Sequence, residues 1–204
     1  MALRVFGLGL PKSGTSTLQD AFLRSGMKSL HWYTKTVEKF AGNSMYHRWY
    51  RGENIMADFP GFEAVTQPDL ITTTTSFWPQ MDPAMLREVA RQNPDVKFIL
   101  NLRDPVAIAN SMEKWGNFME RLHKVGAPGM PPRCATTKKR VIRWIEGHYA
   151  NTMELFEGKD NFLSYDIEDK DANIRIGEFI GQPLEWWGHS NKTRENGETR
   201  GVVY

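Results

Sequence analysis

The stretch GLGLPKSGTSTLQDAF, residues 7–22, joins a short apolar segment to a run with helical spacing of its apolar residues. Residues 3–8 predict a buried strand, and residues 15–25 predict a helix. A glycine-rich turn between a strand and a helix is typical of loops that bind phosphate. In a Walker A loop, GxxxxGK[ST], the lysine follows the last glycine directly, whereas Lys12 lies two residues before Gly14. The stretch therefore predicts a phosphate-binding loop of another kind.

Strand and helix patterns alternate along the rest of the chain, although residues 52–83 show no clear pattern. Further strands are expected at residues 29–32, 96–102 and 161–165, and further helices at residues 35–50, 82–92, 104–115, 134–156 and 172–180. This alternation predicts a three-layer α/β fold, in which helices flank a parallel sheet as in P-loop NTPases. We expect one domain covering residues 1–204.

The composition excludes several classes of protein. The chain has 204 residues, of which 40% are hydrophobic, so it can bury a core. Its 26 Lys and Arg against 24 Asp and Glu do not predict a nucleic-acid-binding protein. Cys134 is the single cysteine, which excludes an internal disulfide and suits a reducing compartment. No apolar run reaches the about 20 residues of a membrane span, so we expect a cytoplasmic protein.

The side chains of the first loop suit an anion. Its glycines allow a close turn, and Ser13, Thr15 and Ser16 add hydroxyl donors beside the charge of Lys12. In a parallel α/β sheet such a loop lies at the carboxyl ends of the strands, where ligands bind. We therefore expect the ligand of this protein to be a phosphate compound held at that edge.

The string PKSGTSTL resembles the P-K-x-G-T-[TS] loop of sulfotransferases that use PAPS, 3′-phosphoadenosine 5′-phosphosulfate. In that family the loop binds the 5′-phosphosulfate, and its lysine assists the departure of the bridging oxygen. The resemblance implies that role for Lys12, and binding of the 5′-phosphate by Ser13, Gly14, Thr15 and Ser16. A loop of this kind needs no GK[ST] pair, because the hydroxyl of that pair normally holds Mg²⁺.

Two later motifs extend the resemblance. The segment RDPVAIANS supplies Arg103 and, eight positions later, Ser111, which match the family's pair for the 3′-phosphate. A guanidinium can fork onto a phosphate, and a helix start can place a serine hydroxyl beside it. The segment NFLSYDIEDKD resembles the strand end that places a tyrosine near the adenine, here Tyr165; packing of that tyrosine at a strand end is the alternative.

The chain departs from the family pattern at two places. Many soluble members have a tryptophan that stacks on the adenine, where this chain has Thr17. The tail HSNKTRENGETRG offers Lys192 and Arg194, but not the spacing of the family's R-K-G motif. These two residues are either phosphate ligands or part of a solvated tail.

Sulfuryl transfer also needs a group that takes the proton of the acceptor. Soluble members use a histidine before the 3′-phosphate arginine, but the stretch SFWPQMDP contains none. His31, at the end of the second expected strand, is our first candidate, followed by Asp58 and then Glu63.

The resemblance implies a PAPS-dependent sulfotransferase that needs no metal and releases adenosine 3′,5′-bisphosphate. The acceptor is expected to be a small molecule or a glycan, and neither its identity nor the oligomeric state follows from the sequence. A Mg²⁺-dependent P-loop kinase of a small molecule and a non-catalytic nucleotide-binding module are the alternatives.

Overall fold

A five-stranded parallel sheet forms the centre of the computed structural model, which describes residues 2–188 and 190. The strand order is β2 (Ser29–Leu30), β5 (Ala64–Val65), β1 (Val5–Gly7), β8 (Lys97–Leu102) and β9 (Phe162–Asp166). Every neighbouring pair in this sheet is parallel, and Val5 is level with both Ala64 and Lys97. The carboxyl ends of the strands therefore share one edge, called the carboxyl edge below.

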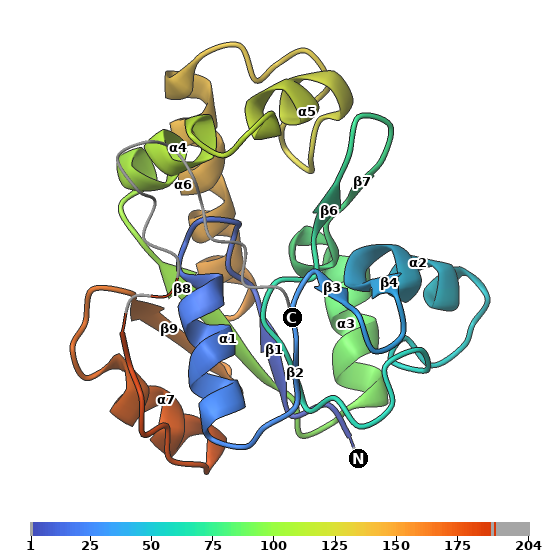
Figure 1. Cartoon of the computed structure of the whole chain (residues 1–204), viewed down its shortest axis with the longest axis vertical. Helices are drawn as coiled ribbons and strands as arrows, with labels where there is room; N and C mark the ends of the chain where they lie inside the picture. The colour runs from blue at the N-terminus through green and yellow to red at the C-terminus, as the bar shows by residue number, and fades with distance from the viewer. Residues whose placement is uncertain (1, 189, 191–204) are drawn as a thin grey trace.

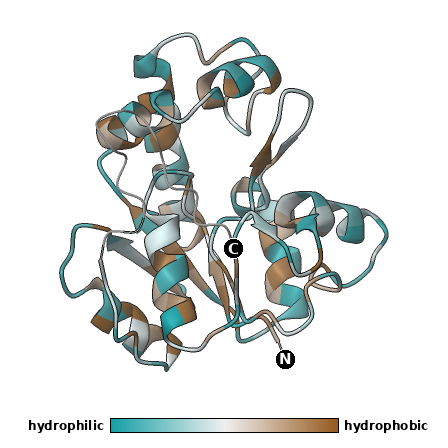
Figure 2. Cartoon of the chain, viewed as in Figure 1, coloured by the Kyte–Doolittle hydropathy of each residue, from teal (hydrophilic) through white to brown (hydrophobic). Residues whose placement is uncertain are grey.

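Helices cover both faces of the sheet (Figure 1). Val5 and Ile99 pack in one cluster with residues of α1 (Thr15–Arg24) and α7 (Ala172–Ile180). Their strand neighbours pack on the other face, in a cluster that includes residues of α3 (Pro83–Gln92) and the end of α6 (Lys138–Leu155). Apolar and polar bands alternate along α1 and α3 (Figure 2), as expected of helices that cover a sheet. The predicted α/β sandwich is confirmed.

Smaller elements extend the carboxyl edge on two sides. A third apolar cluster joins α4 (Pro105–Glu113), α5 (Phe118–Val125) and α6. On the other side lie α2 (Ala41–Tyr50), the hairpins β3 (Tyr33–Thr34)–β4 (Lys39–Phe40) and β6 (Leu70–Ile71)–β7 (Ser76–Phe77), and the short helix η1 (Pro79–Met81). Figure 1 shows these two groups above and to the right of the sheet.

The main differences from the sequence-based prediction are two later helix starts and one additional helix. The helix expected from residue 35 begins at Ala41, because residues 33–40 form a hairpin in which the rings of Tyr33 and Phe40 lie 5.0 Å apart. The helix α5 was not predicted; its eight residues gain their burial from Phe118 and Leu122 in the third cluster. The helix expected from residue 134 begins at Lys138, where the Thr137 side chain accepts a hydrogen bond from the Arg140 N–H.

Within the described residues, none of the helices has both the length and the apolar character needed to cross a membrane.

Candidate functional site

The loop after β1 has the close turn that its glycines predict. Lys12 has a φ of 70° and Gly14 a φ of 98°, both in the left-handed region. The Ser13 hydroxyl donates to the Leu10 carbonyl at 2.7 Å, which closes the turn. A β-carbon on Gly9 would lie 2.8 Å from the Ser13 Oγ, so the loop excludes a side chain there. Strained non-glycine residues of this kind concentrate at functional sites.

Asn101 and Tyr165 support the loop from the sheet. They are level with each other on β8 and β9, and the Asn101 Nδ2 donates to the Tyr165 hydroxyl at 2.7 Å. The Asn101 Oδ1 lies 3.0 Å from the position of a β-carbon on Gly9. The Tyr165 ring is only 1% exposed, and burial raises its pKa well above the usual value. Tyr165 thus supports the loop through Asn101. Its contact with adenine stays a prediction.

The first turn of α1 faces the loop. Gly14 occupies the N-cap position, and because it has no side chain it supplies no cap of its own to this helix end. The backbone N–H groups of such an end attract anions. Ser16 lies in the same turn, and the buried Thr15 hydroxyl donates to the Gln67 Oε1 at 2.6 Å.

Arg103 brings the second sequence motif to the loop. It follows the last residue of β8, and its Nη1 donates to the Lys12 carbonyl at 2.8 Å. The next residue, Asp104, caps α4 by accepting hydrogen bonds from two backbone N–H groups, which orients the helix that carries Ser111. Two motifs that lie 91 positions apart in the sequence therefore meet at one place.

The Lys12 ammonium extends across the carboxyl edge toward α5. Its Nζ lies 5.1 Å from the ring centroid of Trp115, in the turn between α4 and α5. The Arg121 guanidinium carbon lies 5.9 Å from the centroid of the same ring. Partial burial, followed by the charge of Arg103, lowers the pKa of Lys12 below the usual range.

A buried carboxylate, Asp69, lies beyond the end of β5 on the other side of the loop. Its side chain is 4% exposed and accepts hydrogen bonds from the Gln67 Nε2 at 3.3 Å and the Gln80 Nε2 at 2.8 Å. Burial raises the pKa of Asp69 to about 7, against the lowering effect of these amides and of Arg121. A carboxyl that titrates near neutrality suits proton transfer.

These contacts form a closed succession of neighbours, called the ring below, that starts and ends at the glycine loop. From Lys12 the ring passes through Trp115 to Arg121, whose Nη1 donates to the Ile71 carbonyl at 2.6 Å. It returns through Asp69 and its hydrogen-bond partner Gln67 to the Thr15 hydroxyl. The ring thus links two cations, one carboxylate and the first residue of α1 through successive contacts.

The sequence analysis did not identify Asp69, Gln80 or Arg121 as site residues. Asp69 and Gln80 lie within residues 52–83, where no periodicity marked the elements, and Arg121 lies on the unpredicted α5. Within TQPDL, the carboxylate that follows a short apolar strand was the available signal. That signal was weak, because a strand of two residues has too few positions to show a period.

His31 lies just beyond β2, at the carboxyl edge as predicted. Its Nδ1 lies 2.9 Å from the Thr66 Oγ1, while the Thr66 hydroxyl donates to the Gln19 Oε1 at 2.8 Å. This arrangement assigns the Nδ1 proton to the bond with Thr66. Burial lowers the pKa of His31 to about 3, so the ring is neutral and a weak base at neutral pH.

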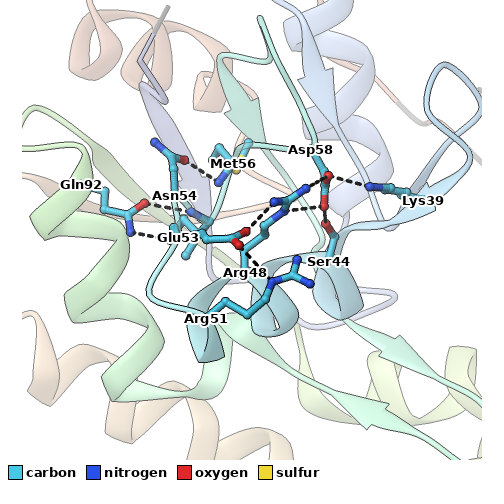
Figure 3. Close-up of polar contacts among 10 residues, drawn as sticks. Lys39, Ser44, Arg48, Arg51, Glu53, Asn54, Met56, Asp58 and Gln92 are labelled. Carbon is cyan, nitrogen blue, oxygen red and sulfur yellow. Dashed lines mark hydrogen bonds and ion pairs between the residues drawn. The ribbon is translucent and has the colours of Figure 1, made fainter.

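Asp58 lies in a network of ions rather than at the loop (Figure 3). Arg48 donates to it from the Nε at 3.0 Å, Lys39 donates at 2.6 Å, and the Ser44 hydroxyl completes the set. The Arg48 guanidinium, with smaller effects of Lys39 and Ser44, holds the pKa of Asp58 well below its usual range. These contacts make Asp58 a poor proton acceptor, although its role in turnover stays a prediction.

The remaining candidates have simpler placements. Glu63 precedes β5 at the amino edge of the sheet, where it pairs with Arg4 at 3.3 Å, on the side away from the loop. Lys192 and Arg194 lie outside the described residues.

A pocket of about 1000 Å³ lies between α3, α6 and the loop at residues 128–134. It is lined by apolar side chains that include Met81, Leu86, Met130, Trp144 and Leu155. Two buried polar residues in its wall connect it to the carboxyl edge: Gln80 donates to Asp69, and the His148 Nε2 lies 2.8 Å from the carbonyl oxygen of Leu8. The pocket thus adjoins residues that support the ring and the loop.

Comparisons with known proteins agree with this architecture. The fold is similar to that of a sulfotransferase domain from the curacin biosynthetic pathway (TM-score 0.53, 13% identity, covering 91% of this chain and 76% of that chain). It is also similar to a sulfotransferase domain from the Synechococcus PCC 7002 olefin synthase (TM-score 0.50, 12% identity, covering 91% and 76%). No curated protein matched the sequence. A family model described as "Sulfotransferase domain" matches residues 4–127, more than half of the chain and including the glycine loop and Arg103. The chain therefore belongs to the sulfotransferase domain family.

Proposed function

We propose that this protein transfers a sulfuryl group from PAPS to a hydroxyl or amine of an acceptor. The family supports the reaction type. The observation that carries the choice of donor is the contact between Arg103 and the Lys12 carbonyl, because it joins the expected 5′- and 3′-phosphate motifs in one site. A donor with phosphates at both positions can span such a site.

The side chains present fit that donor. Two phosphate-bearing ends require cations and N–H or O–H donors. Lys12, the start of α1 and the hydroxyls of Thr15 and Ser16 would bind the 5′ end. Arg103 has further guanidinium donors besides the one that Lys12 occupies, and with Ser111 it would bind the 3′-phosphate. The donor, when bound, supplies a sulfur atom that a nucleophile can attack in line.

Each residue has a distinct chemical task in this proposal. The Lys12 ammonium stabilises negative charge at the leaving oxygen, and its lowered pKa also allows it to give up a proton more readily. The acceptor oxygen bonds to sulfur while the bond from sulfur to the bridging oxygen breaks, and that electron pair stays on the 5′-phosphate. The Asp69 carboxylate takes the proton of the acceptor.

The choice of Asp69 over His31 follows from their environments. Both are buried at the carboxyl edge, but the His31 ring has a pKa of about 3 and lies just beyond β2, an edge strand of the sheet. Asp69 belongs to the ring, and its pKa of about 7 suits a base at neutral pH. His31 remains the second candidate.

Calorimetric titration with adenosine 3′,5′-bisphosphate, and separately with ATP and Mg²⁺, tests the donor. We expect metal-free binding of the bisphosphate that weakens about 10- to 100-fold in Arg103→Ala, since charge-assisted hydrogen bonds are lost. Lys12→Ala should weaken binding as well. Arg143→Ala is the matched control, because Arg143 is 84% exposed and pairs only with Glu146 on its own helix among the described residues.

Two results would contradict the proposal. Binding of ATP with Mg²⁺ in preference to the bisphosphate would favour a kinase. Equal effects of Arg103→Ala and Arg143→Ala would remove the 3′-phosphate site on which the choice of donor depends.

A further inference from the structure

The pocket between α3 and α6 extends along one side of α6. Its lining includes Arg140, Trp144, Gly147, Asn151 and Glu154, which recur at intervals of three or four residues. Residues with this spacing share one side of a helix, here over about four turns. Arg140, Asn151 and Glu154 are exposed, so the pocket opens to solvent along this side. An elongated, open space beside a helix has a shape that a second helix can fill.

Gly147 lies near the middle of this side of α6. A β-carbon at this position would meet no atom within 4 Å, and its φ is not in the left-handed region. Packing in the described structure therefore gives no reason for a glycine, although a glycine in a helix interior costs about 1 kcal/mol relative to alanine. The distance between two packed helices depends on the side chains at their contact. A helix that crosses α6 can approach it most closely at Gly147.

The charges of α6 are separated along the helix. Its first six residues include four cations, whereas its acidic residues, Glu146 and Glu154, come later. The first turn has no acidic residue, and the last turn has no basic residue. The helix dipole favours the opposite order, with acidic residues at the N-terminus and basic residues at the C-terminus. The stability of an isolated α6 therefore does not explain this order, whereas an antiparallel partner helix with the same order would complement it.

Arg140 and Glu154 are the charges that matter most for such a partner. Both line the pocket, and neither has a salt bridge among the described residues. The Arg140 Nη1 donates to the carbonyl oxygen of Cys134 at 3.3 Å, which is a neutral acceptor. The pocket thus carries a cation near one end and a carboxylate near the other, each without an oppositely charged partner.

The positions of these two charges are symmetric about Gly147. Arg140 lies seven residues before it and Glu154 seven residues after it, which is about two turns in each direction. In an antiparallel pair of α6 helices with Gly147 at the two-fold axis, Arg140 is level with Glu154 of the partner subunit. The symmetry repeats this pair at the other end, and the two helix dipoles lie antiparallel.

We propose that this protein forms a two-fold symmetric dimer in which α6 of each subunit lies antiparallel in the pocket of the other. The two Gly147 residues meet at the axis, and Arg140 pairs with Glu154 of the partner subunit at each end. Met81, Pro83 and Leu155 line the pocket and keep some exposed surface, so they supply apolar contact. Because both subunits use the same surface, the assembly closes at two copies. This inference does not depend on the proposed function.

Sedimentation equilibrium of the whole chain, at about 1 to 100 μM, tests the dimer. We expect the wild type to be a dimer at the upper concentrations. Arg140→Glu and Glu154→Arg each place like charges opposite one another at both ends of the interface. Either single change should therefore raise the dimer Kd by at least about tenfold.

The double variant Arg140→Glu/Glu154→Arg provides the decisive comparison. It exchanges the two charges, so each end of the interface again pairs a cation with a carboxylate, and the dimer Kd should return to within a fewfold of the wild-type value. Lys139→Glu is the matched control, because it changes the net charge as Arg140→Glu does but alters a residue that does not line the pocket. Its dimer Kd should stay within a fewfold of the wild type.

Gly147→Trp tests the position of the axis. An indole from each subunit at the crossing would hold the helices apart, so the dimer Kd should rise by at least about tenfold. Gly147→Ala is the control, because packed helices are about 8–10 Å apart and leave room for a methyl group. If Gly147→Trp does not fold, as judged by circular dichroism, the three charge variants still test the dimer, since they change exposed positions.

Four outcomes would overturn the inference. The first is a wild type that is monomeric at about 100 μM, a concentration at which an interface of this kind should hold. The second is an equal effect of Lys139→Glu and Arg140→Glu on the dimer. The third is a double variant that associates no better than the single variants, because Arg140 and Glu154 would then not face each other. The fourth is an unchanged dimer Kd in a folded Gly147→Trp.

Discussion

Asp69 and Asp58 are two carboxylates with little exposed surface, but their hydrogen-bond donors differ and their pKa values shift in opposite directions. Neutral amides are the side-chain hydrogen-bond donors to Asp69, whereas cations and a hydroxyl bind Asp58. The pKa of Asp69 is accordingly raised to about 7, and that of Asp58 is lowered. The whole residue Asp69 is 4% exposed, and the side chain of Asp58 is 11% exposed.

This difference shows that limited exposure alone does not identify a chemical role for a carboxylate. Cations neutralise Asp58 and tie α2 to the loop before β5, which is a structural function. Amide partners leave Asp69 able to take a proton near neutral pH, beside a loop that binds anions in our proposal. The partners, rather than the residue type, separate the two sites.

The largest expected effect is on turnover. Asp69→Asn should lower kcat about 10²- to 10⁴-fold, the usual contribution of a positioned base. Asp58→Asn should leave kcat within a fewfold of the wild type. Steady-state kinetics with PAPS and a phenol acceptor measure both variants, and calorimetry with the bisphosphate checks that each still binds nucleotide. A larger kcat loss in Asp58→Asn than in Asp69→Asn would reverse the comparison.

The pH dependence of kcat should also depend on Asp69 and not on Asp58. A base must be ionised to take a proton, so wild-type kcat should rise as pH increases through about 7 and then level off. The rise should disappear in Asp69→Asn and persist in Asp58→Asn. A rise centred near pH 3 would instead indicate His31, whose pKa is about 3.

A smaller effect is expected on the free energy of unfolding. Ionisation should lower it at Asp69 and raise it at Asp58. The folded-state pKa of Asp69 is raised, so ionisation of Asp69 makes the wild type less stable as pH rises from the ordinary carboxyl pKa of 3.8 through about 7. Asparagine does not titrate. The stability of Asp69→Asn relative to the wild type should therefore increase between about pH 5 and pH 8.

For Asp58 the sign is reversed. Its folded-state pKa is lowered, so its stabilising contribution is fully present above the ordinary pKa of 3.8 and is lost as pH falls through the lowered value. The stability deficit of Asp58→Asn should therefore shrink on acidification below about pH 4. Thermal unfolding across pH measures both variants. Parallel pH profiles for the two would show that their carboxylates are not held differently.

The smallest effect is expected at the pocket wall, outside both carboxylate sites. Gly147→Ala should raise the free energy of unfolding by about 0.5–1 kcal/mol, because alanine restricts the unfolded chain and suits a helix. Gly181→Ala is the control: a β-carbon there also meets no atom, but a φ of 69° disfavours it, so this variant should be less stable. Denaturant unfolding compares them. A loss of stability in Gly147→Ala would show that packing requires that glycine.

The sequence allowed prediction of the elements with long periodic patterns. The strand β8 and the helices α1, α3 and α7 lie where residues 96–102, 15–25, 82–92 and 172–180 predicted them. The hairpins and α5 were not predictable in this way, because elements of two residues have no period and α5 is stabilised by packing in a tertiary cluster. Asp69 and Gln80 lie among these short elements.

By itself, the sequence determined the family-like loop, the Arg103 motif and the parallel α/β class, because each depends on local spacing or periodicity. The tertiary structure decided which carboxylate has a pKa near neutrality. That property depends on the burial and the hydrogen-bond donors around each group, and these donors come from distant parts of the chain, such as the Gln80 amide at Asp69. Likewise, only the tertiary structure brings Gly147 of α6 and Gln80 of η1 to the wall of one pocket.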